Sequence, residues 1–154
     1  MPKTSAGLLM YRIREGALEV LLVHPGGPFW RSKDKGAWTI PKGEIGSDED
    51  ALAAARREFE EETGLRAKGP FIPLTPVRQK GGKTVRAWAF AGDCDPQRLR
   101  SNVFELEWPP GSGQAREFPE TDRAGFFGLD ETLEKMNPAQ VPLVEELAAR
   151  LKLE

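Results

Sequence analysis

One segment constrains the fold of this chain more than any other, because residues 47–64 have the composition of a single helix with a strongly acidic surface. Ser47 is a suitable N-cap residue, and three acids follow it in the first turn, where they favour the positive end of the helix dipole. Gly64 is the kind of residue at which a helix stops in a left-handed conformation. The segment therefore predicts a helix that begins after Ser47 and ends at about Thr63.

Three glutamates of this helix, Glu58, Glu61 and Glu62, are spaced i, i+3 and i+4, so they share one face. Like-charged pairs at these spacings cost roughly 0.2–0.5 kcal/mol each in an isolated helix. A bound divalent cation would turn that repulsion into ligation, and oxygen ligands without histidine or cysteine favour Mg²⁺ or Mn²⁺. The alternative interpretation is a solvated acidic face that binds nothing.

Short apolar runs on both sides of the helix predict strands, with hairpin turns at residues 14–16 and around Gly81 and Gly82. Helices around such strands favour an α/β layered sandwich with a mixed sheet, in a single domain that covers residues 1–154. A long loop is expected from Pro109 to Phe118. Strands are expected at residues 6–13, 18–25, 37–41, 71–79, 84–91, 102–108 and 123–129, and further helices at residues 130–135 and 141–151.

Composition excludes several classes of protein. No apolar run approaches the ~20 residues that span a bilayer, and the first residues lead directly into a strand, so we expect no membrane association and no secretory signal peptide. The single cysteine, Cys94, and the single histidine, His24, argue against disulfides and histidine-based metal clusters. These features favour a cytoplasmic location. The chain outside residues 43–65 is mildly basic, which suits an anionic small molecule but is too weak to indicate DNA binding.

The residues around the three glutamates narrow the interpretation. Reading from Gly43, the chain fits the pattern G-x5-E-x7-R-E-U-x-E-E-x-G-U, in which U is an apolar residue, at every specified position. This segment resembles the signature of the Nudix hydrolases, and the flanking strands and closing helices are similar to that family as well. The resemblance implies a Nudix-type α/β/α sandwich with a mixed β-sheet between helices.

The resemblance also implies an activity: divalent-metal-dependent hydrolysis of a phosphoanhydride bond in a nucleoside polyphosphate. Mg²⁺ is the implied cofactor, and Mn²⁺ is the implied substitute. An ion pair between Arg57 and Glu49 would hold the loop before the helix and orient Glu58. The implied metal ligands are the carbonyl group of Gly43 and the carboxylates of Glu58, Glu61 and Glu62.

The general base is the least constrained part of this interpretation. Glu120 precedes the last predicted strand and resembles the position that completes the site in diadenosine-tetraphosphate and RNA-pyrophosphate Nudix hydrolases. We therefore expect Glu120 to be an additional metal ligand or the base. Glu105 and Glu107 are rival candidates, although their alternation with apolar residues also fits the solvent-facing side of a strand.

Residues 38–43 point to a substrate class. Their sequence, WTIPKG, resembles the W-x-[FL]-P-K-G run of diadenosine-tetraphosphate hydrolases, so a diadenosine polyphosphate is the favoured substrate. Lys42, Arg31 and Trp38 are the expected substrate-binding residues, and basic residues such as Lys83 could also serve a long polyphosphate. The alternatives are nucleoside triphosphates, nucleotide sugars or RNA 5′-ends, or a Nudix module that senses a nucleotide without cleaving it. We expect the chain to act as a monomer or homodimer.

Overall fold

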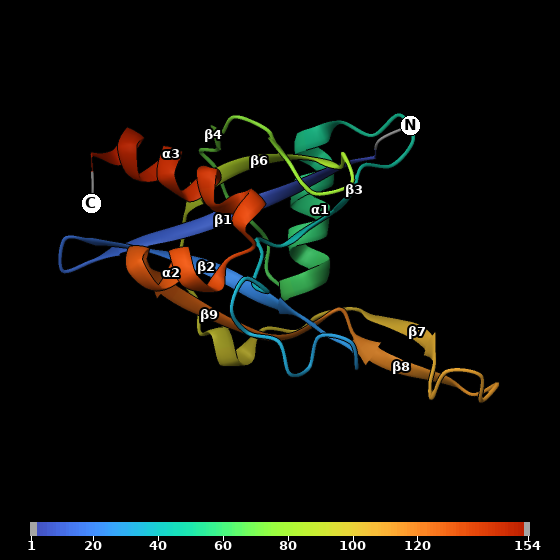
Figure 1. The fold of residues 1–154 in the computed structure, drawn as a ribbon. Coiled ribbons are helices and arrows are strands. Elements are labelled where there is room, and N and C mark those ends of the chain that lie inside the picture. Colours follow the sequence, from blue (N-terminus) through green and yellow to red (C-terminus); the bar gives the residue numbers. More distant parts are fainter. Residues whose placement is uncertain (1–2, 153–154) are drawn as a thin grey trace.

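The computed structural model describes residues 3–152, and within them seven strands form a mixed sheet (Figure 1). The main path of the sheet is β4-β6-β1-β2-β9, with β3 paired to β1 and β5 paired to β6. Strands β1 and β6 run parallel, and the other pairs are antiparallel. The strands are β1 (Thr4–Arg14), β2 (Ala17–Pro25), β3 (Lys42–Glu44), β4 (Ile72–Pro73), β5 (Val77–Arg78), β6 (Thr84–Ala91) and β9 (Thr121–Gly128).

Helices cover both faces of this sheet. Leu8 and Met10 of β1 pack in the same apolar cluster as α1 (Ala51–Thr63), whereas Leu9 between them packs in the cluster of α3 (Val141–Leu151). Because successive strand residues point to opposite faces, α1 and α3 lie on opposite sides of the sheet. The short helix α2 (Leu129–Lys135) follows β9. The predicted α/β/α sandwich is therefore confirmed.

The first hairpin forms as predicted. Glu15 and Gly16 at its tip have φ angles of 51° and 80°, and Arg14 pairs directly with Ala17. Two successive residues with positive φ give the two-residue turn whose twist matches that of the flanking strands. The hairpin fixes the register of β1 and β2 at the centre of the sheet.

The start of α1 differs from the prediction. The helix begins at Ala51, and Asp50 is its N-cap, because the Asp50 side chain accepts a hydrogen bond from the Ala53 N–H at 3.0 Å. Ser47 was expected in this role, but it lies in a loop in which Asp48 has a φ of 61°. The end of the helix is as predicted: Gly64 is left-handed, and its N–H donates to the Glu60 carbonyl.

Three other predictions were wrong in part. Residues 71–79 form two short strands, β4 and β5, instead of one. Residues 37–41 make isolated bridges at Trp38 and Thr39 instead of a strand, and the strand β3 follows directly. The predicted loop from Pro109 to Phe118 contains most of β8 (Ala115–Pro119), which pairs with β7 (Val103–Glu107) in a separate hairpin. This hairpin projects from the body of the molecule (Figure 1). No helix among residues 3–152 is long and apolar enough to cross a membrane.

Candidate active site

Arg57 fastens the loop that precedes α1 to the helix. Its Nε and Nη2 atoms donate to the two carboxylate oxygens of Glu49 at 2.8 and 2.9 Å, and Nη2 also donates to the Glu44 carbonyl at 3.2 Å. The Arg57 hydrogen bonds, together with one from the Gly46 N–H, lower the pKa of Glu49 to about 2. The structure thus contains the ion pair expected between Arg57 and Glu49.

The same arginine also gathers two of the three helix glutamates. Arg57 Nη1 donates to Glu58 Oε1 at 2.9 Å and to Glu61 Oε2 at 3.1 Å. Hydrogen bonds to Glu49 and Glu58 raise the pKa of Arg57, so the guanidinium remains charged. Arg57 therefore offsets part of the repulsion that the spacing of the glutamates creates.

Gly43 lies directly against the Glu58 carboxylate. A Cβ atom at position 43 would sit 2.0 Å from Glu58 Cδ, so any other residue there would displace the Glu58 carboxylate. Burial raises the pKa of Glu58, and the charges of Glu61 and Glu120 act in the same direction. Strand β3, which contains Gly43, therefore meets the acidic face of α1 at this point.

Glu62 is the most deeply placed carboxylate of the group, with 9% of its surface exposed. Its Oε2 accepts from the Lys42 N–H at 3.2 Å, and its Oε1 accepts from the Thr121 hydroxyl at 3.4 Å. Burial is the main reason that the pKa of Glu62 rises to about 8, and the charges of Glu58 and Glu120 raise it further. Residues from α1, β3 and β9 thus surround one desolvated carboxyl group.

Glu120 reaches this cluster through the base of the β7–β8 hairpin. Its N–H donates to the Asn102 carbonyl at 2.8 Å, and the Asn102 N–H donates to the Glu61 carbonyl at 2.8 Å. Burial and the charge of Glu61 raise the pKa of Glu120. The rival candidates are placed differently: Glu105 lies opposite Glu117 in the hairpin, and Glu107 accepts from the Gly111 N–H at the hairpin tip.

These groups fit a hard divalent cation by their chemistry, since the donors are carboxylate and carbonyl oxygens and Gly43 leaves the space that a side chain would fill. Among residues 3–152, however, no three carboxylate, histidine or cysteine side chains form a preformed cation cage. Glu58 and Glu61 are engaged by Arg57. Binding of a cation therefore requires at least one of these carboxylates to turn from the arginine toward the ion.

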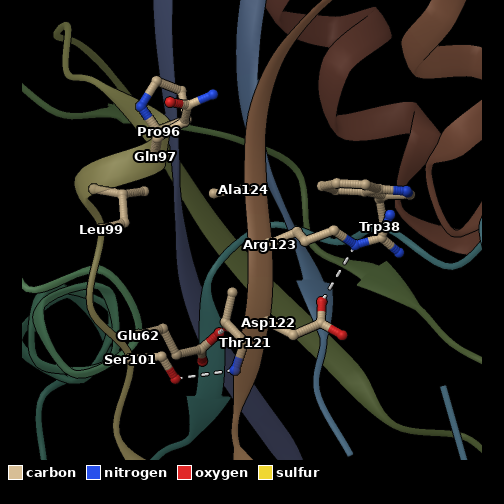
Figure 2. A pocket seen from close by; sticks show the side chains of 10 residues that line it. All are labelled: Trp38, Glu62, Pro96, Gln97, Leu99, Ser101, Thr121, Asp122, Arg123 and Ala124. Atoms are coloured by element: carbon tan, nitrogen blue, oxygen red, sulfur yellow. Dashed lines mark hydrogen bonds and ion pairs between the residues drawn. The ribbon is translucent and has the colours of Figure 1, made fainter. Parts of the chain in front are cut away.

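Two cavities meet at this cluster, and Glu62 and Thr121 line both of them. The first, which we call the Lys42 cavity, has a volume of about 370 Å³ and includes Lys42, Glu120 and Trp30. The second, the Trp38 cavity, has a volume of about 420 Å³ and lies along β9 (Figure 2). The carboxylates therefore stand at the junction of two spaces, each large enough for part of a nucleotide.

Lys42 lies in the site, whereas the other two expected substrate-binding residues, Trp38 and Arg31, do not both line it. Trp38 is 5% exposed, and its Nε1–H donates to Asp34 at 2.8 Å, so it is chiefly a core residue of which one part lines the Trp38 cavity. Arg31 is exposed and lines neither cavity. Burial and the nearby charge of Lys83 lower the pKa of Lys42, whereas the charges of Glu62 and Glu58 act in the opposite direction, so Lys42 lies beside these carboxylates.

Sequence reasoning missed four residues that line or support the site: Asn102, Thr121, Gln97 and Arg123. Thr121 follows Glu120, and this adjacency was the one available signal. Gln97, Asn102 and Arg123 lie in parts of the chain that carry no recognisable motif. His24 is fully buried, and its Nδ1 is 2.7 Å from Asp122 Oδ1, so it is a structural residue.

The fold is similar to solved structures of several nucleotide-related proteins. One is an Ap4A hydrolase from C. elegans in a binary complex, which is 22% identical with a TM-score of 0.67 over 97% of this chain and 98% of that one. Another is the NUDIX domain of NrtR from Shewanella oneidensis complexed with ADP ribose, which is 15% identical with a TM-score of 0.68 over 98% of this chain and 89% of that one. At these identities the likeness establishes the fold.

Curated sequences give a second comparison. Nudix hydrolase 7 of Arabidopsis thaliana is 39% identical over 74 residues, which are 48% of this chain and 24% of that protein. An octanoyltransferase of Myxococcus xanthus is 28% identical over 145 residues, which are 87% of this chain and 36% of that protein. The chain thus spans about a quarter to a third of the length of these relatives.

A family model settles the assignment that the glutamate cluster and the fold both indicate. Residues 1–147 match the model of the NUDIX domain, a range that includes α1, the loop before it and Glu120. With nearly the whole chain covered by that match, this protein belongs to the Nudix family.

Proposed function

We propose that this chain is a divalent-metal-dependent pyrophosphohydrolase that cleaves a phosphoanhydride bond in a nucleoside polyphosphate. The observation that carries the proposal is the position of Glu62, a desolvated carboxylate at the junction of two cavities, with Glu58, Glu120 and Lys42 around it. A stable fold gains nothing from burying such a group among like charges. The arrangement is understandable if the carboxylates bind a cation and a phosphate chain.

In this proposal, Glu58, Glu61, Glu62 and the Gly43 carbonyl hold Mg²⁺, with Mn²⁺ as a substitute. The ion neutralises phosphate oxygens and lowers the pKa of water when it is bound. Glu120, whose raised pKa favours proton uptake, is an additional ligand or the general base. Arg57 and Glu49 hold the loop and orient Glu58.

Lys42 and Lys83 supply the positive charge that a phosphate chain needs. Lys42 lines the same cavity as Glu62 and Glu120, and the charge of Lys83 acts directly on Lys42. The charges of Glu62 and Glu58 already favour the charged form of Lys42, and a phosphate chain that entered the same cavity would add to that effect.

The favoured substrate is a diadenosine polyphosphate. The support is the run from Trp38 to Gly43, the placement of Glu120 beside the helix glutamates, and the likeness of the fold to a C. elegans Ap4A hydrolase. Nucleoside triphosphates, nucleotide sugars and RNA 5′-ends are the alternatives, and a non-catalytic nucleotide sensor is the alternative outside enzymes. A cytoplasmic location, a monomeric or homodimeric state and the absence of DNA binding stay predictions.

The test of the proposal is the turnover of Glu62→Gln with Mg²⁺ and a diadenosine polyphosphate. We expect a loss of at least ~100-fold, because the variant loses charge that stabilises the transition state. Glu60→Gln is the matched control: Glu60 lies on the same helix but is exposed, and its nearest cation is Arg66 at 3.9 Å. Equal turnover in the Glu62 variant, the control and the wild type would contradict the proposal.

A panel of candidate substrates tests which class of compound the protein hydrolyses. It comprises diadenosine polyphosphates, nucleoside triphosphates, ADP-ribose, nucleotide sugars and capped RNA, each with Mg²⁺, with Mn²⁺ and with a chelator. Preference for the diadenosine compounds supports the favoured substrate, and preference for another compound overturns it. Binding of a nucleotide without hydrolysis of any compound would support the sensor instead.

A further inference from the structure

The two cavities that share Glu62 and Thr121 differ in the residues that complete them. The Lys42 cavity contains Lys42, whose charge interacts with Lys83, Glu62 and Glu58, together with the carboxylate of Glu120. The Trp38 cavity combines apolar residues, namely Trp38, Pro96, Leu99 and Ala124, with polar residues that include Gln97 and Arg123. Such a mixture can cover the flat face of a nucleobase and hydrogen-bond its edge.

The charged groups of the Trp38 cavity make it a poor phosphate site. Glu62 and Asp122 both line it, and Arg123 is the one cation among its lining residues. Arg123 Nε lies 3.6 Å from Asp122 Oδ1, so the nearest anion already offsets its charge. Phosphate groups would therefore gain little from Arg123, whereas an uncharged base does not need that charge.

Arg123 and Trp38 form a flat surface beside β9. The guanidinium carbon of Arg123 lies 5.4 Å from the centroid of the Trp38 ring, and Figure 2 shows the two side chains on the same side of the strand. A planar guanidinium stacks on aromatic faces and on nucleobases alike. Half of the Arg123 side chain is exposed, with 51% of its surface accessible, so it is free to accept a further flat group.

Gln97 adds a group that can recognise a base through hydrogen bonds. It lines the same cavity from the short helical turn η1 (Pro96–Arg98), and its backbone N–H is held by the Asp95 carboxylate at 3.0 Å. A side-chain amide offers one donor and one acceptor together, the pair that reads the N6 and N7 edge of adenine. Leu99, two residues further on, supplies the apolar wall.

We propose that the Trp38 cavity binds the nucleobase of the substrate, with Arg123 as the stacking residue and Gln97 as the residue that hydrogen-bonds the base. The inference rests on the proposed function, because it places the phosphate chain across Glu62 and Thr121 into the Lys42 cavity. It makes Arg123 and Gln97 determinants of substrate specificity. Neither residue belongs to the family signature of residues 43–65.

The direct test measures binding of AMP to the metal-free protein by calorimetry. Arg123→Ala and Gln97→Ala are each expected to weaken AMP binding by about 10-fold, the size of the loss of one base contact. Arg116→Ala is the matched control, because Arg116 is an exposed arginine over an aromatic ring, 6.0 Å from the Phe118 centroid, on the hairpin outside the cavity. Unchanged AMP affinity in both cavity variants overturns the proposal.

Kinetics separate this proposal from the proposed function. With diadenosine tetraphosphate, Arg123→Ala should raise KM about 10-fold and leave kcat near the wild-type value, because ground-state and transition-state binding of the base are lost equally. Hydrolysis of inorganic tripolyphosphate, which has no base, should be unchanged in the same variant. If the wild type hydrolyses neither compound nor any other member of the substrate panel, yet AMP binding is lost in Arg123→Ala, the proposed function fails and the nucleobase site stands.

Discussion

Single glycines decide how closely the chain can approach itself at the site. A Cβ at Gly43 would lie 2.0 Å from Glu58 Cδ, one at Gly7 would lie 2.5 Å from the Pro41 carbonyl oxygen, and one at Gly26 would lie 1.9 Å from the Pro119 carbonyl oxygen. At Gly7 and Gly26 the neighbouring atom belongs to the backbone, so backbone would have to move, whereas at Gly43 the Glu58 carboxylate would have to move. The three positions therefore set where Glu58, Lys42 and Glu120 stand relative to one another.

Gly43→Ala tests whether the glycine at this position sets the place of the Glu58 carboxylate. The added methyl group must displace either β3 or the Glu58 carboxylate, and misplacement by about 1 Å can cost on the order of 100-fold in rate. We expect turnover to fall by about that factor while the protein remains folded. Gly128→Ala is the control, because a Cβ there has no heavy atom within 4 Å. Equal rates for the two variants would remove Gly43 from the site.

At the scale of elements, α1 acts as a platform with two functions. Ala54, Ala55 and Phe59 are buried against the sheet, and Phe59 meets Phe90 edge to face with 5.3 Å between ring centroids. The glutamates lie on the neighbouring part of the helix surface, and Glu62 is itself buried. The apolar contacts anchor the helix. The glutamates can therefore stay close together although their like charges repel.

The start of α1 gives a prediction at this scale. Asp50→Ala removes the side chain that caps the Ala53 N–H and should lower the free energy of unfolding by about 1 kcal/mol. Ser47→Ala, at the position that sequence alone favoured, should change it by only a few tenths of a kcal/mol. Urea denaturation of both variants measures the difference. A larger loss for the Ser47 variant would contradict the observed helix start.

At the scale of the whole molecule, the site depends on contacts between distant segments. Backbone hydrogen bonds run from Gly26 to Glu120, from Glu120 to Asn102 and from Asn102 to Glu61, each at 2.8 Å. They join the end of β2, the base of the β7–β8 hairpin and the end of α1. Glu62 is buried where these parts of the chain converge, so the folded structure as a whole raises its pKa.

That burial predicts how stability depends on pH in metal-free protein. The pKa of Glu62 is about 8 when folded, against a reference value of 4.5, so the folded state binds this proton more tightly. The resulting stabilisation is complete below about pH 4.5 and is lost as pH rises through about 8. In a chelator, thermal denaturation should show the Tm of Glu62→Gln rising relative to wild type between pH 5 and 8. Glu60→Gln should show no such trend, and a flat difference for Glu62→Gln would contradict its burial.

The sequence predicted what local patterns encode. Spacing placed the glutamates on one helix face, Gly64 marked the helix end, and the central hairpin followed from its turn residues. The strand β8 was missed because it is short, mostly exposed and paired outside the main sheet, so burial left no alternating pattern in it. Arg123 and Gln97 were missed because their cavity exists only after β9 and residues 96–101 come together.

The proposed hydrolysis requires Glu58, Glu61 and Glu62 to bind a divalent cation beside a phosphate chain. The most direct measurement is anomalous diffraction from a crystal soaked in Mn²⁺ and a nucleotide that cannot be hydrolysed. We predict a strong peak about 2 Å from carboxylate oxygens of these residues, with phosphate oxygens completing the coordination. A map with ordered nucleotide and no anomalous peak among the three glutamates would contradict it.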